Sequence, residues 1–297
     1  MSAATVYAAS RAKHHRRTNA EIATITEAMA RIIAADHPMT LRGLYYRLVS
    51  EGLIPKTENE YEKVGRYLLN LRRDGTIPYA WIADHTRWMR KYRTYNSLEN
   101  ALWQTAATYR RALWNDQAAY VEIWCEKDTL ACILDKETAT WDVPLMVVRG
   151  FASESYVYEA SQHIAANDKP AYLYLLTDHD PSGLASARDV ERKITNFLPS
   201  FPVTVERVSV TEAQIAAWKL PTRPTKQSDS RARDFTGESV ELDAIPPATL
   251  RELVRSCIER HIDPDVLART KDVERLERER LDEIADNLAD SEWGEVA

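Results

Sequence analysis

Hydrophobic residues recur at helical spacing through the first quarter of the chain. Isoleucine and methionine side chains fall at intervals of three and four after Asn19, and Pro38 ends this segment. A second segment of the same kind begins at Thr40, and a third ends at the turn signal Asp74-Gly75. The pattern therefore predicts three short helices, at residues 19–37, 40–51 and 58–73.

From residue 119 the pattern changes to short apolar runs that alternate with amphipathic segments. This alternation predicts parallel strands joined by crossover helices, which is an α/β fold. The expected strands are 120–125, 145–148, 171–177 and 203–210. The expected helices are a bridging helix at 94–115, crossover helices at 128–137, 153–166 and 182–197, and later helices at 247–261 and 266–287; residues 221–238 are expected to form a loop.

A chain of 297 residues is long enough for about two domains. Three short helices, followed by a turn and the aromatic stretch 77–82, fit a winged-helix domain. We therefore expect five segments in chain order. They are a basic arm at 1–18, a winged-helix domain at 19–93, a bridging helix at 94–118, a parallel-sheet domain at 119–262 and a charged C-terminal helix and tail at 263–297.

Composition narrows the class of protein further. The sequence has no run of about 18 apolar residues and no secretory signal, so we expect neither a membrane span nor export. Its cysteines (Cys125, Cys132 and Cys257) have neither the count of a disulfide framework nor metal-ligand spacing, and indicate reduced thiols in the cytoplasm.

The net charge of −6 is unevenly distributed. Residues 1–120 hold 18 Lys and Arg against 11 Asp and Glu, a net charge of +7, whereas the remaining residues carry −13. A basic amino-terminal part on an acidic chain indicates an anionic partner, of which nucleic acid is the commonest. Charge alone equally allows a chance imbalance on a solvated surface.

The second helix carries two adjacent tyrosines on different faces. Tyr45 lies on the apolar stripe, so we expect it to pack in the core. Tyr46 lies about 100° further round, four residues after Arg42 and on the same side, which predicts an exposed phenol beside a guanidinium. An arginine can hold a phosphate while a phenol attacks it. On periodicity alone, a surface tyrosine that merely stacks on the arginine is the commoner case.

The third helix is amphipathic in a way that suits a DNA groove. One stripe is apolar (Tyr61, Val64, Leu68 and Leu71). The opposite stripe is polar and basic, with no interleaved acid, and predicts DNA-binding residues Lys63, Arg66, Asn70 and Arg73. The alternative is a solvated basic face.

Carboxylates follow two of the expected strands. Glu126 follows the first, and Asp178 and Asp180 follow the third, within Asp178-His179-Asp180-Pro181-Ser182-Gly183. The carboxyl ends of parallel strands meet at one edge, where ligands collect, and three carboxylates there suit Mg²⁺. Helix capping is the alternative role of the Asp-x-Asp-Pro segment.

These motifs together resemble a known family. Glu126-Lys127-Asp128 after a strand, Val148-Arg149-Gly150, and Asp178-x-Asp180-Pro181-x-Gly183 look like a Toprim domain, of the kind found in the A subunit of topoisomerase VI and its meiotic double-strand-break relatives. Those proteins place a winged helix first, with an Arg-acid-aliphatic-aromatic-Tyr motif that matches Arg42-Gly43-Leu44-Tyr45-Tyr46. The resemblance covers about residues 38–245, with Val240-Glu241-Leu242-Asp243-Ala244 as a weaker match, and Gly43 replaces the usual acid.

The resemblance implies a function and partners. Tyr46 would be the nucleophile that leaves a 5′-phosphotyrosyl end on duplex DNA, Arg42 would steady the phosphate, and Glu126, Asp178 and Asp180 would hold Mg²⁺. It also implies a homodimer in which the tyrosine of one protomer works with the metal of the other. The chain has no ATPase module, so it resembles the minimal stand-alone A subunits of mobile elements and phages, acting at the nucleoid, with a separate ATPase B-type subunit as a further partner. Two alternatives stay open: a metal-dependent nuclease that uses water, and a DNA-binding protein without catalysis.

Overall fold

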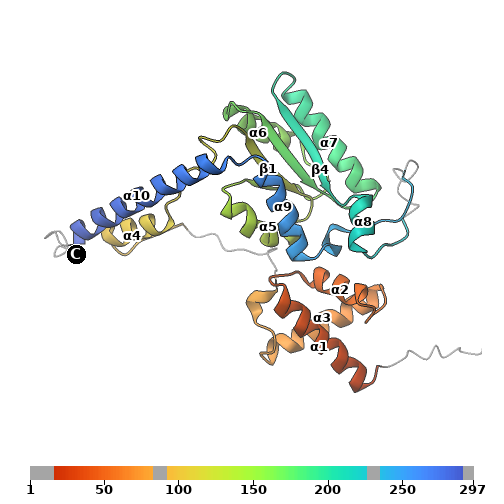
Figure 1. Cartoon of the computed structure of the whole chain (residues 1–297). Helices are drawn as coiled ribbons and strands as arrows, with labels where there is room; N and C mark the ends of the chain where they lie inside the picture. Colours follow the sequence, from red (N-terminus) through yellow and green to blue (C-terminus); the bar gives the residue numbers. More distant parts are fainter. Residues whose placement is uncertain (1–16, 83–91, 226–234, 290–297) are drawn as a thin grey trace, which may run out of the picture.

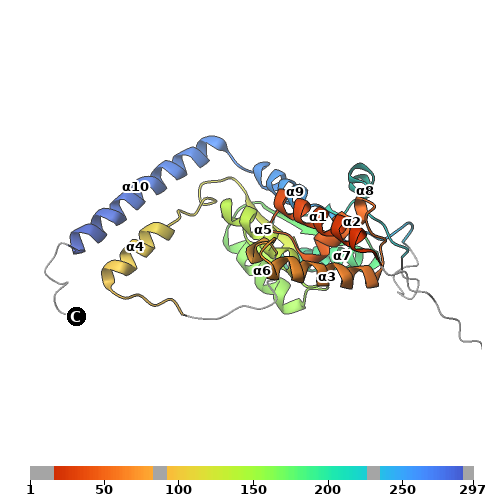
Figure 2. The same ribbon diagram turned by 90° about the horizontal axis from the view of Figure 1, so that it is seen from below.

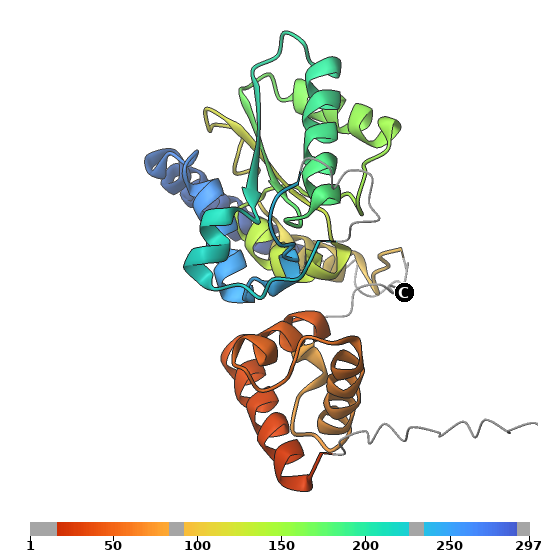
Figure 3. The same cartoon turned by 90° about the vertical axis from the view of Figure 1, so that its right-hand side faces the viewer.

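The computed structural model describes residues 17–82, 92–225 and 235–289. These residues form a smaller helical domain at the amino-terminal side and a larger α/β domain, which lie one above the other in Figure 3. Most of the expected basic arm, the stretch 83–91 after the third helix, part of the 221–238 loop and the C-terminal residues 290–297 lie outside the described residues.

The helices of the amino-terminal domain begin where threonines cap them. Thr18, Thr40 and Thr57 each accept a hydrogen bond from the backbone N–H three residues later, which satisfies a donor that the first turn leaves free. The apolar stripes meet in a core that includes Met29, Ile33, Leu44, Leu48 and Leu68. The elements are α1 (Asn19–Ala35), α2 (Leu41–Ser50), α3 (Glu58–Arg73) and the 3₁₀ helix η1 (Tyr79–Trp81).

The expected wing is not seen in the described residues. The aromatic stretch 77–82 forms η1, and its pairing with the rest of the domain is a single bridge between Met39 and Ile82. The three helices are therefore confirmed, whereas the winged-helix assignment stays a prediction.

The α/β domain contains the parallel sheet that the sequence predicts. The strands are β1 (Tyr120–Cys125), β2 (Leu145–Val147), β3 (Ala171–Leu176) and β4 (Val203–Ser209), in the order β2-β1-β3-β4 with every neighbouring pair parallel. Cys125 at the end of β1 lies beside Val147 of β2 and Leu176 of β3. The carboxyl ends of these three strands therefore share one edge of the sheet.

Helices cover both faces of this sheet (Figure 1). On one face, Trp124 and Leu173 pack with Val157, Ile164 and Ile194 of two crossover helices. On the other face, Ile123 and Tyr174 belong to the core that also holds the remaining crossover helix and a later one. The first pair is α6 (Glu154–Ala166) and α7 (Pro181–Phe197), and the second pair is α5 (Asp128–Thr140) and α9 (Pro247–Glu259).

Two elements differ from the sequence-based expectation. The bridging helix α4 (Leu98–Thr108) is shorter than the predicted 94–115, because Ser97 caps its start and Tyr109 is already extended. A short helix α8 (Glu212–Trp218), which the sequence analysis did not predict, follows β4 and begins at a capping box of Thr211 and Gln214.

The longest helix forms an arm with α4 that extends away from the α/β domain (Figure 2). This helix, α10 (Pro264–Ala289), runs beside α4 in the opposite direction. The Tyr109 hydroxyl donates to Glu277 at 2.7 Å, Arg278 Nε donates to the Tyr109 carbonyl at 2.8 Å, and Trp103 Nε1 donates to Asp286 at 3.3 Å. Among the described residues, no helix is long and apolar enough to cross a membrane.

The turn from β3 into α7 places Gly183 against the backbone of Asp178. A Cβ at Gly183 would lie 2.4 Å from the Asp178 carbonyl oxygen, which is backbone and cannot move aside freely. We therefore expect Gly183→Ala to lower the free energy of unfolding by about 2 kcal/mol, measured by chemical denaturation. Gly65→Ala is the matched control, because its Cβ would meet only Leu41 Cδ2 at 3.5 Å. That change should be neutral or stabilise by up to about 1 kcal/mol, and equal effects of the two variants would contradict the close approach at Gly183.

Candidate functional site

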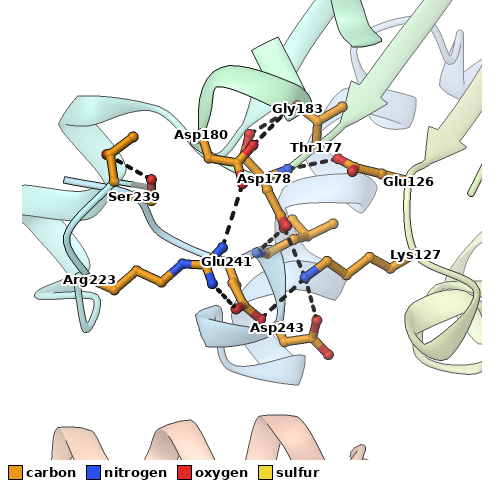
Figure 4. Close-up of polar contacts among 12 residues, drawn as sticks. Glu126, Lys127, Thr177, Asp178, Asp180, Gly183, Arg223, Ser239, Glu241 and Asp243 are labelled. Atoms are coloured by element: carbon orange, nitrogen blue, oxygen red, sulfur yellow. Dashed lines mark hydrogen bonds and ion pairs between the residues drawn. The ribbon is translucent and has the colours of Figure 1, made fainter. Parts of the chain in front are cut away.

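The three predicted metal-binding acids do lie together at the edge of the sheet (Figure 4). Glu126 Oε2 accepts a hydrogen bond from the Asp178 backbone N–H at 3.1 Å, which joins the ends of β1 and β3. Asp180 Oδ1 accepts from the Gly183 N–H at 2.8 Å and so caps α7. The predicted convergence of Glu126, Asp178 and Asp180 is therefore seen, and the capping alternative is also seen for Asp180.

A lysine lies at the centre of the acidic side chains. The Lys127 ammonium is 3.0 Å from Asp178 Oδ1, 2.9 Å from Asp243 Oδ2 and 3.5 Å from Glu241 Oε2. Burial opposes its charge, but the three carboxylates outweigh burial and raise the pKa of Lys127. The ammonium therefore stays protonated and holds β1, β3 and the segment at 241–243 together.

Burial also affects the predicted metal ligands. It raises the pKa of Glu126, and the nearby negative charge of Asp178 raises it further. Burial likewise raises the pKa of Asp178, although Lys127 and the Leu242 N–H, which donates to Asp178 Oδ1 at 2.7 Å, favour the ionised form. Crowded, partly desolvated carboxylates thus surround the Lys127 ammonium.

Glu241 contacts cations from three segments of the chain. Its carboxylate is 3.1 Å from Arg42 of α2, 3.5 Å from Lys127, and 3.2 Å from Arg223, which lies in the segment after α8. Burial opposes ionisation, but the positive charges of Lys127, Arg42 and Arg223 outweigh it and hold the pKa of Glu241 below its usual value. Glu241 is thus an ionised carboxylate between the two domains.

Tyr46 is not exposed, contrary to the prediction from the helical wheel. Its exposed fraction is 4%, and that of Tyr45 is 6%. Tyr45 is placed as expected, with its hydroxyl donating to the Thr57 carbonyl at 3.1 Å. Tyr46 is buried because α2 has a second neighbour: its other side packs on the 3₁₀ helix η3 (Leu242–Ala244) of the α/β domain.

The surroundings of Tyr46 keep its hydroxyl protonated. Burial raises the pKa of Tyr46, and the negative charge of Glu241 raises it further, whereas Arg42 and Lys127 act in the opposite direction. The Lys56 ammonium lies 4.9 Å from the centre of the Tyr46 ring and donates to the Pro221 and Thr222 carbonyls. The fold therefore brings Tyr46 to the acidic cluster of its own chain. The arrangement expected from the resemblance, in which two protomers share each site, stays a prediction.

The glycine that replaces the usual acid in the Arg42 motif has a structural role. The Gly43 N–H donates to the Thr40 hydroxyl at 2.9 Å, and a Cβ at this position would lie 3.3 Å from that oxygen and 3.9 Å from the Asp243 carbonyl. An acidic side chain would meet the Thr40 cap and the segment that carries Glu241. Gly43 therefore allows α2 to approach the α/β domain closely.

Three of the four residues in the predicted DNA-binding stripe of α3 are exposed to solvent. Arg66, Asn70 and Arg73 are exposed, and the opposite stripe is buried at Val64 and Leu68. Lys63 instead pairs with Glu60 at 2.8 Å, and Arg17 pairs with the same carboxylate at 2.5 Å. The expectation that no acid accompanies the stripe is wrong at this position, because Glu60 lies one turn before Lys63.

As placed, these carboxylates do not form a ligand set for Mg²⁺. The described residues contain no group of three acid, histidine or cysteine side chains arranged to hold a metal ion. The reason is visible in Figure 4: Lys127 lies against Asp178, Asp180 caps α7 and faces Arg223 at 3.6 Å, and Glu126 binds backbone. The magnesium site stays a prediction, and we derive no reaction step from it.

Comparison of the sequence with models of known protein families and with curated proteins gave no match. The resemblance described above therefore rests on the sequence motifs of this chain alone.

Four residues of the site were not predicted as site residues. Lys127 belongs to one of the family motifs, and Glu241 and Asp243 belong to the weaker match at 240–244. The motifs give none of these three a role, yet all three side chains belong to the cluster. Arg223 lies in a segment that was interpreted as a polar loop. The available signal was the pair of acids in Val240-Glu241-Leu242-Asp243, two charged residues set between apolar ones.

Removal of the central ammonium should leave the carboxylates uncompensated. We expect Lys127→Met to lower the free energy of unfolding at pH 7 by about 3–5 kcal/mol, measured by chemical denaturation. Burial already raises the pKa values of Glu126 and Asp178, and we expect the loss of Lys127 to leave that of Asp178 further above its unfolded value. The folded state then binds more protons, and stability should rise as the pH falls from 7 towards 5.

Lys136→Met is the matched control, because Lys136 is exposed on α5. It should change stability by less than about 0.5 kcal/mol with no new pH dependence. A Lys127 variant that behaves like this control would contradict the central role of the ammonium.

Proposed function

We propose that this protein cleaves DNA by transesterification, with Tyr46 as the nucleophile. One observation carries the proposal: the fold brings Tyr46 and Arg42 of α2 to the cluster at the carboxyl ends of the strands, although they lie 80 or more positions apart in sequence. A phenol, a guanidinium and a lysine beside acidic groups make up a site suited to a phosphodiester. The resemblance to the topoisomerase VI A subunit assigns Tyr46 the same role.

The proposed reaction exchanges one ester for another. The Tyr46 oxygen attacks phosphorus, the bond from phosphorus to the 3′ oxygen breaks, and the phenol proton is balanced by protonation of the 3′ oxygen. Arg42 steadies the phosphate by charge-assisted hydrogen bonds. The products are a 5′-phosphotyrosyl end and a free 3′-hydroxyl, with no external oxidant or energy source. Mg²⁺, duplex DNA and a second copy of the chain are the proposed cofactor, substrate and partner.

The covalent intermediate is the decisive test. Tyr46→Phe should fold and bind DNA but form no protein–DNA adduct when a reaction with supercoiled DNA and Mg²⁺ is stopped with denaturant. Tyr45→Phe is the matched control, since it loses only the hydrogen bond to Thr57. It should retain the adduct at a cost of about 1 kcal/mol in stability.

Other outcomes separate the alternatives. Cleavage without an adduct would favour hydrolysis by water, and DNA binding without cleavage would favour a non-catalytic protein. An adduct that persists in Tyr46→Phe would contradict the assignment of the nucleophile. An adduct that persists after chelation of divalent cations would contradict the predicted need for Mg²⁺.

The exposed polar stripe of α3 is the proposed duplex contact. Combined replacement of Arg66, Asn70 and Arg73 by alanine should weaken binding and lower the slope of log affinity against log salt by about one unit per lost phosphate contact. Lys63→Ala is the comparison variant, because its ammonium is already paired with Glu60. Fluorescence anisotropy at several salt concentrations measures the slope, and an unchanged slope in the triple variant would mean that the stripe is a solvated face.

A further inference from the structure

The cations around Glu241 come from three separate parts of the chain. Arg42 belongs to α2 of the amino-terminal domain, Lys127 to the turn after β1, and Arg223 to the segment that pairs with Ser239. Lys127 has two further carboxylates, and Arg223 also faces Asp180 at 3.6 Å. Arg42 has no other ion pair among the described residues.

A carboxylate fills this position imperfectly. Glu241 is 6% exposed, so its charge is almost fully removed from water. Its Oε2 lies within ion-pair distance of Arg42 and Lys127 but makes no hydrogen bond in the part of the chain that the structure describes. Three cations thus share the two oxygens of a planar group. A phosphate is tetrahedral and offers oxygens in more directions, which suits guanidinium groups that approach from several sides.

One of the three cations faces solvent. The Arg42 side chain is 48% exposed. Arg42 lines an open groove of about 420 Å³ between α2 and α3, together with Tyr61, Arg72 and Thr129. Arg42 is thus the most exposed of the three cations, and solvent reaches it through this groove.

We infer that Arg42, Lys127 and Arg223 form a phosphate-binding subsite, and that the Glu241 carboxylate occupies it in this structure as an internal substitute for the anion. The ligand class is a phosphate group, whether the free ion or a phosphodiester of DNA. The inference rests on the proposed function only for the identity of that phosphate as the one that Tyr46 attacks. In this arrangement the Tyr46 hydroxyl faces a resident anion, whose charge adds to burial in raising the pKa of Tyr46.

Removal of the internal anion should open the subsite. Glu241→Ala takes away the carboxylate and its side chain, so inorganic phosphate should bind with a dissociation constant of about 1 mM or lower. Wild-type protein should bind at least about tenfold more weakly. Titration followed by phosphorus NMR line width, together with thermal unfolding at each phosphate concentration, measures both binding and the stabilisation that it brings.

Two further variants make the test specific. Glu238→Gln is the matched control. Glu238 lies three residues before Glu241, accepts a hydrogen bond from the Thr222 hydroxyl, and has no ion pair with the three cations among the described residues. This variant should bind phosphate as weakly as wild type. Arg223→Ala combined with Glu241→Ala should lose the gained phosphate affinity. Glu241→Gln keeps the side-chain volume without the charge, and should bind with an affinity between wild type and Glu241→Ala. It replaces the alanine variant if that variant does not fold.

Several results would overturn the inference. One is an unchanged phosphate affinity in folded Glu241→Ala or Glu241→Gln. The others are a gain of equal size in Glu238→Gln, and a gain in affinity that survives the loss of Arg223. Each would mean that Glu241 is only an ion-paired contact between the domains. A duplex DNA arm separates the source of phosphate, because Glu241→Ala should also bind DNA more tightly if the subsite takes a phosphodiester. Failure of the proposed function would appear differently, as phosphate binding without any Tyr46 adduct.

Discussion

The ion pairs of one buried ammonium hold the centre of this molecule together. Lys127 contacts Asp178 after β3 and Asp243 of η3, and it lies next in sequence to Glu126 at the end of β1. Without a cation there, carboxylates from three segments would face one another in a partly dry environment, which strongly opposes folding. Because η3 is fixed by this contact, α2 has a surface on which to pack, and the two domains meet at a defined place. The placement of Tyr46 is therefore a consequence of charge neutralisation about Lys127.

The contacts that place Tyr46 at the site also make its hydroxyl less reactive. The contacts that bring Tyr46 to the sheet edge also bury it and raise the pKa of its hydroxyl. A nucleophile of this kind needs access to its substrate and a way to lose its proton. The same residues that assemble the site thus hold it in an unreactive state, and a substrate must compete with contacts inside the protein.

The sequence was sufficient to predict the elements and insufficient to predict their mutual contacts. The bounds of α3 and β1 agree with the periodicity, and the parallel order of the sheet follows from alternating strands and helices. These features depend on local propensity and on patterns within a few residues. The helical wheel correctly placed Tyr45 in the core but wrongly placed Tyr46 at the surface. A helical wheel describes one buried face, whereas α2 is covered on a second side by η3, about 200 residues later in the sequence. The ion pairs of Glu241 were missed for the same reason, since charges separated this widely in sequence leave no periodic signal.

The arm of α4 and α10 determines how far the domains can separate. The chain from Ile82 to Leu98 can span at most about 55 Å when fully extended. While α10 holds α4, this length of chain is the whole covalent connection between the amino-terminal domain and α4. Without the contacts of α10 on α4, the next attachment to the α/β domain is at Arg110, whose guanidinium donates to the Ala139 and Thr140 carbonyls, and the reach would rise to about 95 Å. The docking of α10 on α4 therefore shortens the covalent connection that links the two domains, and so limits the separation that the chain itself permits.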